Sequence, residues 1–416
     1  LDVVVDDAAA QYPLTIDPTV GDENWVSMGG VPGADNTVLA MVKDASGNLY
    51  MGGSFTVVGN VIAKRIVKWN GTAWSTLGSG MNSTIYALAL DSSGNLYAGG
   101  DFNTAGGVAA NRIAKWNGSA WSALGTGINS NVYALALDGS GNLYAGGIFT
   151  TAGGVAAKNI AKWNGTAWSA LGTGMNSAVN ALALDSSGNL YAGGNFTTAG
   201  GVAANRIAKW NGSAWNALGT GMSGGTDPYV HALALDSSGN LYAGGQFTTA
   251  GGVPANNIAK WNGTAWSALG TGMSSAVSAL ALDSSGNLYA GGSFITAGGV
   301  AANRIAKWNG TAWSALGTGM NSYVQVLALD SSGNLYAGGS FTTAGGVAAN
   351  RIAKWNGSAW SALGTGINSN VYALALDGSG NLYAGGIFTT AGGVAAKNIA
   401  KWNGTAWSAL GTGMNS

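Results

Sequence analysis

Apolar and polar residues alternate along most of the chain in short stretches that turn residues separate. In residues 85–124 the stretches fall at 85–91, 95–102, 112–116 and 120–124. Asp-Ser-Ser-Gly-Asn between the first two supplies an aspartate that can cap a turn and a glycine for positive φ. Asn-Gly between the last two is a strong hairpin signal. Because no helical period is present, the pattern predicts four antiparallel strands.

This four-stranded unit recurs through residues 37–416. A Trp-Asn-Gly-[Ser/Thr]-Ala-Trp segment marks each unit, and its even-residue loop places both tryptophans on one face of the sheet. Eight such units predict an all-β fold, an eight-bladed β-propeller with four antiparallel strands per blade of about 47 residues. An Asp-x-Ser-Gly-Asn-Leu-Tyr turn begins at eight aspartates, with spacings of 47 residues and one of 51: Asp44, Asp91, Asp138, Asp185, Asp236, Asp283, Asp330 and Asp377.

The order of the motifs resembles the kelch repeat over roughly residues 24–416. Leu-Tyr-Ala-Gly-Gly-x-Phe ends a second strand in Gly-Gly, and Ile-Ala-Lys-Trp and Ala-Trp-Ser-Ala-Leu-Gly follow. The long Phe-Thr-Thr-Ala-Gly-Gly-Val-Ala-Ala connection departs from kelch, and the aspartate turn looks more like NHL and related sensor-type propellers. The whole unit is similar to repeats in large secreted bacterial surface proteins. The resemblance implies a propeller with its first strand innermost and an extracellular or cell-surface location.

In an up-and-down blade, alternate connections lie on opposite faces of the ring. The aspartate turn and the Asn-Gly turn should share one face, here called the turn face. The connections between strands two and three and between consecutive blades should share the other, here called the loop face. We therefore expect Asn117 and Gly106 on opposite faces.

The N-terminal region differs from the repeats. Residues 1–22 are interpreted as an acidic linker or the tail of a preceding domain, since six of the 17 acidic residues fall in the first 23 positions. The propeller is predicted to span 23–416. Residues 24–30 resemble a surplus fourth strand, so the chain supplies 33 strands where eight blades need 32. We expect residues 406–410, local to their own hairpin, to complete the last blade.

The surplus strand must then cover another edge. An unpaired strand exposes backbone donors and acceptors, so it pairs either within its own ring or with a neighbouring molecule. We therefore expect self-association to run through residues 1–30.

The composition of the chain excludes several classes of functional site. The chain has no cysteine, one histidine (His231), and 17 basic against 17 acidic residues. These counts exclude a disulfide scaffold, a cysteine-based zinc site, a thiol nucleophile and a polybasic nucleic-acid surface. A run of about 18 apolar residues is absent, so membrane insertion is not predicted. With a single imidazole, no nucleophile–base pair can be assembled, and neither catalysis nor a cofactor is predicted.

Several repeated residues have both a structural and a functional interpretation. The turn aspartates lack the density of a calcium loop, so turn capping is favoured and no metal site is predicted. The Asn-Gly-[Ser/Thr] segments match the glycosylation pattern, but hairpin chemistry explains them. The tryptophan pairs could stack on sugars, and packing between blades is favoured. Basic residues lie on or just before the third strand in 16 of 17 cases, where matching acids are expected.

Three positions vary among the otherwise similar units, and folding the first hairpin should gather them at the channel mouth. Drift at exposed positions is the alternative. Five residues before the turn aspartate stand Leu39, Tyr86, Tyr133, Asn180, His231, Ser278, Gln325 and Tyr372. Ten residues after it stand Ser54, Asp101, Ile148, Asn195, Gln246, Ser293, Ser340 and Ile387. Seven residues before it stand Thr37, Thr84, Asn131, Ala178, Tyr229, Ala276, Tyr323 and Asn370.

The fifth unit is the best candidate for a localised site. Its four extra residues fall in Ser-Gly-Gly-Thr-Asp-Pro-Tyr-Val-His, in a connection on the loop face, and loops on a rigid scaffold commonly carry recognition. There we expect Gln246 beside His231. The candidate ligand-binding residues are Asp227, Tyr229, His231, Gln246, Tyr86, Asp101, Tyr133, Tyr323, Gln325 and Tyr372.

Taken together, these patterns predict a non-catalytic extracellular scaffold for binding or adhesion. Its expected partner is a protein or glycan on a cell surface or in the extracellular matrix, not nucleic acid. A carbohydrate-binding, lectin-type propeller is one alternative. A structural subunit of a surface assembly or filament, linked through the N-terminal strand, is another.

Overall fold

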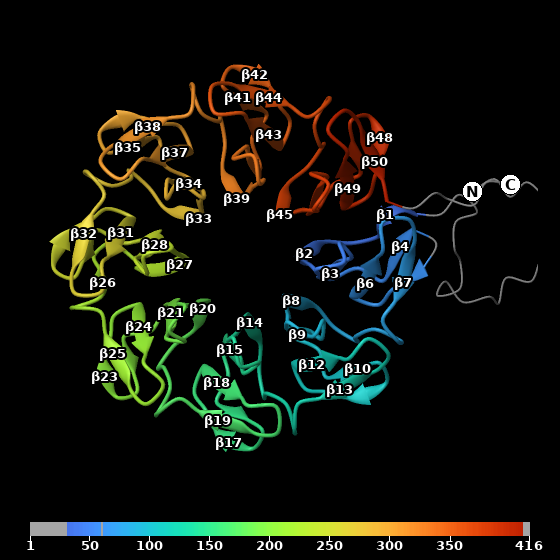
Figure 1. The fold of residues 1–416 in the computed structure, drawn as a ribbon, viewed down its shortest axis with the longest axis vertical. Coiled ribbons are helices and arrows are strands. Elements are labelled where there is room, and N and C mark those ends of the chain that lie inside the picture. The colour runs from blue at the N-terminus through green and yellow to red at the C-terminus, as the bar shows by residue number, and fades with distance from the viewer. Residues whose placement is uncertain (1–30, 60, 411–416) are drawn as a thin grey trace, which may run out of the picture.

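The computed structural model describes residues 31–59 and 61–410. They form a ring of eight four-stranded sheets around a central opening (Figure 1). The predicted eight-bladed propeller is therefore confirmed. The acidic segment 1–22 and the surplus strand 24–30 lie outside the described residues.

The blades are formed by equivalent strands in chain order. The first strands are β2 (Val38–Lys43), β8 (Ile85–Leu90), β14 (Val132–Leu137), β20 (Val179–Leu184), β27 (Tyr229–Leu235), β33 (Val277–Leu282), β39 (Val324–Leu329) and β45 (Val371–Leu376). The second strands are β3 (Leu49–Gly53), β9 (Leu96–Gly100), β15 (Leu143–Gly147), β21 (Leu190–Gly194), β28 (Leu241–Gln246), β34 (Leu288–Gly292), β40 (Leu335–Gly339) and β46 (Leu382–Gly386). The third strands are β6 (Ile66–Trp69), β12 (Ile113–Trp116), β18 (Ile160–Trp163), β24 (Ile207–Trp210), β31 (Ile258–Trp261), β37 (Ile305–Trp308), β43 (Ile352–Trp355) and β49 (Ile399–Trp402). The fourth strands are β7 (Trp74–Thr76), β13 (Trp121–Ala123), β19 (Trp168–Ala170), β25 (Trp215–Ala217), β32 (Trp266–Ala268), β38 (Trp313–Ala315), β44 (Trp360–Ala362) and β50 (Trp407–Ala409).

Within a blade the strands follow one another from the channel outwards. In the second blade the sheet order is β8-β9-β12-β13, and the bounds of the four strands agree with the predicted stretches to within two residues. The first strands line the opening (Figure 1). Trp116 pairs directly with Trp121 across β12 and β13, with ring centroids 5.5 Å apart. The expected strand order and tryptophan pairing are both confirmed.

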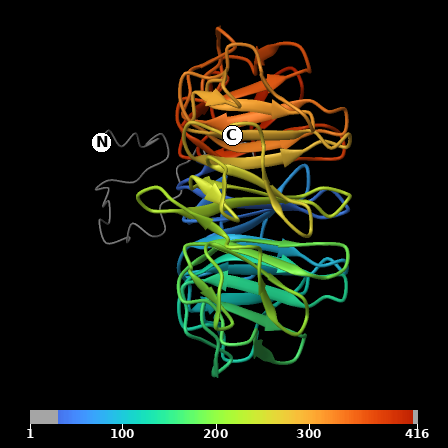
Figure 2. The same ribbon diagram turned by 90° about the vertical axis from the view of Figure 1, so that its left-hand side faces the viewer.

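The two faces of the ring carry the connections that were expected on them. The strands run across the thickness of the ring, from one face to the other (Figure 2). The Gly106 amide donates to the carbonyl of Gly80, 2.7 Å away, in the connection that links the first blade to the second. Asn117 lies in the turn at the opposite end of β12, where its Oδ1 accepts from the amide of Ala120. Asn117 and Gly106 therefore lie on opposite faces, as predicted.

The long connection between strands two and three contains a short hairpin that the sequence analysis did not predict. Its two glycines, Gly106 and Gly107 in the second blade, both adopt positive φ, at 59° and 82°, which suits a two-residue turn. The hairpins are β4–β5 (Val57–Gly59, Val61–Ile62), β10–β11 (Thr104–Ala105, Val108–Ala109), β16–β17 (Thr151–Ala152, Val155–Ala156), β22–β23 (Thr198–Ala199, Val202–Ala203), β29–β30 (Thr249–Ala250, Val253–Pro254), β35–β36 (Thr296–Ala297, Val300–Ala301), β41–β42 (Thr343–Ala344, Val347–Ala348) and β47–β48 (Thr390–Ala391, Val394–Ala395). In the fifth blade β26 (Met222–Ser223) adds to one of them, β29.

The hydrophobic core lies between the blades. Each cluster joins one blade to residues of the preceding blade, such as Tyr97 and Leu124 against the third blade. The fourth-strand tryptophan is buried, and its indole donates to the preceding blade: Trp168 Nε1 lies 2.7 Å from the carbonyl oxygen of Leu124. A Cβ on Gly146 would stand 2.6 Å from Cγ1 of Val179, so the Gly-Gly motif lets the next blade approach. Packing between blades, the favoured role of the tryptophans, is thus confirmed.

The same contact closes the ring between the last blade and the first. Trp74 Nε1 donates to the carbonyl of Leu410 at 2.7 Å, and Leu410 joins the core cluster of the first blade. Strand β50 completes the last blade, as expected for the copy at residues 406–410. The segment β1 (Val31–Ala34) pairs with β4, and the Ala34 amide donates to the carbonyl of Lys397 at 2.6 Å. Within residues 31–59 and 61–410, the ring therefore closes through these contacts, and each four-stranded blade is built from the strands of one repeat.

On the turn face, each repeat builds a compact polar cluster. Oδ1 of Asp138 accepts from the amides of Ser140 and Asn142, and its Oδ2 accepts from Asn142 Nδ2 and the Tyr144 hydroxyl. Lys162 Nζ lies 5.4 Å from the centroid of the Tyr144 ring. Burial raises the pKa of the Asp138 carboxyl, but the hydrogen bonds from Asn142 and Ser140 outweigh it and leave the pKa lowered. The turn aspartates therefore cap their turns, as predicted.

We expect Trp168→Phe to lower the stability by about 1–3 kcal/mol, because it leaves the buried carbonyl of Leu124 without its donor. The midpoint of urea unfolding measures the loss. Trp163→Phe is the matched control, since Trp163 is equally buried but does not make this bond between blades. Equal shifts in the two variants would contradict the proposed importance of the indole bond.

The ring should lose stability steeply at alkaline pH. Burial and the neighbouring turn aspartate raise the pKa to about 12 for Tyr50, Tyr144, Tyr191, Tyr336 and Tyr383. Because the folded-state pKa lies above the ordinary value of 10, this stability is complete below pH 10 and is lost between pH 10 and 12. Unfolding followed by circular dichroism against pH measures it.

A variant with Tyr144→Phe, Tyr191→Phe and Tyr336→Phe removes three of these phenols. Its stability should therefore fall less between pH 10 and 12. A pH dependence identical to that of the parent chain would show that these tyrosines do not control alkaline unfolding.

Candidate functional site at the channel mouth

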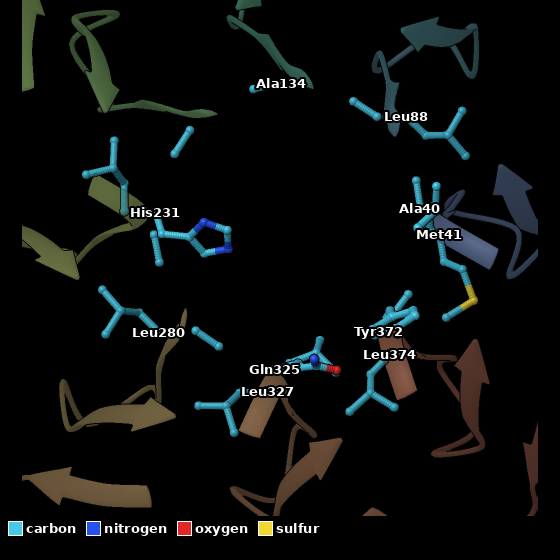
Figure 3. Close-up of a pocket in the computed structure, with 18 of the residues that line it drawn as sticks. Ala40, Met41, Leu88, Ala134, His231, Leu280, Gln325, Leu327, Tyr372 and Leu374 are labelled. Carbon is cyan, nitrogen blue, oxygen red and sulfur yellow. The ribbon is translucent and has the colours of Figure 1, made fainter. Parts of the chain in front are cut away.

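The central channel holds a cavity of about 490 Å³, and most of the residues that line it are of apolar type. Alanine and leucine side chains of the first strands, such as Ala134 and Leu280, line it on all sides (Figure 3). Three polar side chains join them, from the fifth, seventh and eighth blades: His231, Gln325 and Tyr372 point into the opening in Figure 3. All three stand five residues before the turn aspartate, which we call the channel position.

The channel position is a β-bulge. In the fifth blade Val230 pairs with Gly245 and Ala232 pairs with Gly244, so His231 is the extra residue on its strand. The same shift in register occurs in the first hairpin of every blade. A bulged residue leaves the regular ladder and its side chain is re-aimed. This explains why the position varies without disturbing the sheet.

The other two variable positions, seven before and ten after the turn aspartate, are called the rim positions. They pair with each other: Gln246 lies opposite Tyr229, and the Ile148 amide donates to the carbonyl of Asn131. Gln246 therefore faces Tyr229 directly, while the bulge leaves His231 without a partner in the strand pairing. In the fourth blade the channel and rim side chains do touch, since Asn180 Nδ2 donates to Asn195 Oδ1 at 2.8 Å.

The fifth blade brings together three of its four candidate residues. The rings of Tyr229 and His231 meet edge to face with centroids 6.3 Å apart, and Gln246 lies across from Tyr229. Asp227 is exposed in the inserted connection. Burial within the ring of strands lowers the pKa of His231, although its side chain reaches the open channel. The imidazole is therefore a neutral donor and acceptor at pH 7.

A second group lies where the second and third blades meet. Tyr86 and Tyr133 contact edge to face, with ring centroids 5.6 Å apart. Arg112 Nε lies 3.4 Å from Oδ1 of Asp101. Burial, together with the charge of Asp101, raises the pKa of Tyr86. This group combines two phenols with an ion pair.

The remaining candidates lie in the seventh and eighth blades. Tyr323 is 53% exposed, and the Arg304 guanidinium stands 5.9 Å from its ring centroid. Gln325 Oε1 is buried and has no hydrogen-bond partner among the described residues. The Tyr372 hydroxyl accepts from Asn370 Nδ2 at 3.3 Å. Three of the ten candidates, His231, Gln325 and Tyr372, therefore share the central cavity, and the others form separate groups around the mouth.

Sequence reasoning missed a further position, 21 residues after the turn aspartate, which we call the collar position. All eight residues there adopt positive φ, between 58° and 68°. This backbone region suits asparagine and is unusual for arginine. The recurrence of either Arg or Asn there is the available signal, and it is hidden when the arginines are grouped with the lysines of the third strand. The residues are Arg65, Arg112, Asn159, Arg206, Asn257, Arg304, Arg351 and Asn398.

The part of the chain that the structure describes contains neither a candidate metal site nor a candidate membrane-spanning helix. Over residues 31–59 and 61–410, no group of three or more His, Cys, Asp or Glu side chains could hold a metal ion. Within the same ranges the structure has no helix long and apolar enough to cross a membrane.

Comparison with known proteins places the fold but not the function. No protein-family model matches the sequence, and no curated protein matches it. The fold is similar to that of the computationally designed protein Ika8, with a TM-score of 0.59 and 18% identity over 90% of this chain and 98% of Ika8.

Two other solved structures are less similar. The extracellular domain of BT4673 from B. thetaiotaomicron has a TM-score of 0.48 and 14% identity, over 91% of this chain and 47% of that one. The WD40 β-propeller domain of Doa1 has a TM-score of 0.46 and 14% identity, over 74% of this chain and 92% of that one.

We expect the imidazole of His231 to titrate below pH 6.5, because burial disfavours its charged form. His231 is the only histidine of the chain, so its ring signals in a proton NMR titration need no assignment. A midpoint at or above 6.5 would show that the channel solvates the imidazolium as well as bulk water does.

Proposed function

We propose that the chain is a non-catalytic binding or adhesion scaffold that acts outside the cell. Its partner is a protein or a glycan on a cell surface or in the extracellular matrix. The kelch-like order of Gly-Gly and tryptophan, and the similarity of the unit to repeats of large secreted bacterial surface proteins, support this location and type.

The observation that carries the proposal is the separation of constant from variable residues. The repeated aspartates, glycines and tryptophans cap turns or pack between blades, and they form the framework of the ring. The channel and rim positions differ from blade to blade and gather around one mouth. A rigid ring that presents different side chains at equivalent positions suits recognition.

A lectin-type propeller is the second candidate, and one observation favours it. Tyr323 is exposed beside Arg304, so an aromatic face and a cation stand together at the rim. The paired tryptophans cannot provide such a surface, because they are buried between blades.

The test replaces residues of the mouth by residues that another unit already has at the same position, so the fold should be kept. Ser278 occupies the channel position in the sixth unit and Ala276 a rim position there. In one variant Tyr86, Tyr133, His231 and Tyr372 become Ser, and Tyr229 and Tyr323 become Ala. Arrays of glycans and of purified extracellular matrix proteins identify a ligand for the parent chain. We expect the variant to bind that ligand at least about tenfold more weakly, because aromatic residues dominate such interfaces.

The control carries Ser93→Ala and Ser187→Ala, which change the turn face only. Ser93 and Ser187 supply only backbone amides to the turn aspartates, so the framework is kept. Unchanged affinity in the six-residue variant would overturn the mouth as the recognition surface.

A further inference from the structure

We propose that the loop face carries a repeated anion-binding site centred on the collar arginines, and that its ligand is an acidic polysaccharide bearing carboxylate or sulfate groups. This inference rests on the proposed binding function and names the class of ligand. Five of the eight blades supply an arginine: Arg65, Arg112, Arg206, Arg304 and Arg351.

At the collar position, an asparagine side chain forms a more complete set of hydrogen bonds than an arginine side chain does. Where the blade has Asn159, its Oδ1 accepts from the amide of Phe149 at 3.1 Å and its Nδ2 donates to the carbonyl of Met175 at 2.8 Å. Asn is also the residue that tolerates this positive φ. The framework alone therefore favours Asn in every blade.

Arginine at the same position leaves donors unused. Nη1 of Arg304 donates to the carbonyl of Phe294 at 3.0 Å, whereas its Nε is buried without a hydrogen-bond partner among the described residues. Arg351 has the same arrangement. A guanidinium has five N–H donors in a planar fork that matches carboxylate and sulfate groups. All five arginines adopt this unfavourable φ. Arg206 donates from its Nε to the carbonyl of Pro228 at 2.8 Å, but the Nε of Arg112, Arg304 and Arg351 is buried without a hydrogen-bond partner among the described residues, which indicates a role outside the framework.

The charges of the two faces differ. On the turn face, each third-strand lysine lies over a tyrosine ring that also bonds the turn aspartate, as Lys162 does with Tyr144 and Asp138. On the loop face of the described chain, only three acids, Asp35, Asp101 and Asp227, accompany the basic residues. Those are Lys64, Arg65, Arg112, Lys158, Arg206, Arg304, Arg351 and Lys397. The turn aspartates therefore accompany the lysines of the third strand on the turn face, whereas at the collar one arginine, Arg112, has an acid within ion-pair distance, Asp101.

A small polar pocket accompanies the collar arginine where two blades meet. Between the second and third blades, Arg112, Thr126 and Asn129 line a pocket of about 340 Å³. The equivalent residues line a pocket of the same volume between the sixth and seventh blades: Arg304, Thr318 and Asn321. This volume is at the lower end of the range for small-ligand sites. It suits one charged sugar unit.

An exposed aromatic ring stands beside one of these pockets, and this favours a saccharide over other polyanions. Tyr323 offers its ring next to Arg304. An apolar ring face packs against a pyranose, while the guanidinium pairs with the acidic substituent. Repetition of the site from blade to blade matches a polymer whose charges also repeat.

The test replaces Arg112, Arg304 and Arg351 together by Asn in the full chain. The chain already carries Asn at this position in three blades, so the variant should fold, with a melting temperature equal to or above that of the parent. The probes are heparin, which carries sulfate and carboxylate groups, polygalacturonate, which carries carboxylates only, and neutral dextran. We expect the parent to bind one or both acidic probes, and the variant to bind at least about tenfold more weakly.

A matched control removes the same charge from the turn face, through Lys162→Gln, Lys260→Gln and Lys354→Gln. Its affinity should equal that of the parent. Equal losses of affinity in the two variants would show that net charge alone causes the effect, and would overturn the proposed site. Failure of the parent to bind either acidic probe, or equal binding of dextran, would overturn it as well.

Two further results separate this inference from its alternatives. If a peptide of residues 1–23, which holds six acids, binds the arginines more tightly than either polysaccharide, the collar is a docking surface for this chain and the saccharide assignment is wrong. A second outcome is that neither acidic probe binds the parent, while the six-residue mouth variant loses binding of another ligand that the arginine variant still binds. This outcome would support the proposed function and overturn the collar site.

Discussion

The bond from a buried indole to a backbone carbonyl of the preceding blade is the contact on which the ring depends. It has the same length, 2.7 Å, at Trp168 within the ring and at Trp74 across its closure. Because closure uses a contact that every blade can make, no strand has to cross from one end of the chain to the other. The same bond forms across the insertion in the fifth unit. There Trp266 Nε1 lies 2.7 Å from the carbonyl oxygen of Leu218, although a longer stretch of chain separates the two residues.

This framework determines where variation is possible. The buried side chains of the second to fourth strands are held between blades, and the Gly-Gly motif allows no Cβ at the point of closest approach. The bulged channel position and the rim lie outside these contacts, and the collar accepts either Asn or Arg. Differences among the units therefore concentrate at the mouth and on the loop face, with no need for a dedicated binding domain.

The sequence predicted the features that depend on period and pairing. Four strands per unit, the direct pairing of Trp116 with Trp121 and the two faces follow from alternation and from turn residues, which are local. The bulge was not visible because it moves one residue, such as His231, out of register without changing the apolar pattern around it. The separation of arginines from lysines was missed because Arg112 and Lys115 lie three residues apart in sequence but belong to opposite faces of the ring.

Identical sequence does not give identical chemistry in this ring. Residues 111–177 and 350–416 have the same sequence, yet Arg112 lies within ion-pair distance of Asp101, whereas the equivalent rim position before Arg351 is Ser340, which carries no charge. Tyr133 likewise contacts Tyr86 of the preceding blade edge to face.

Its equivalent Tyr372 follows a blade with Gln325 at the channel position, and bonds Asn370 instead. Each site at the mouth is therefore assembled from two consecutive blades. The order of the units around the ring is what gives one repeated sequence several distinct surfaces.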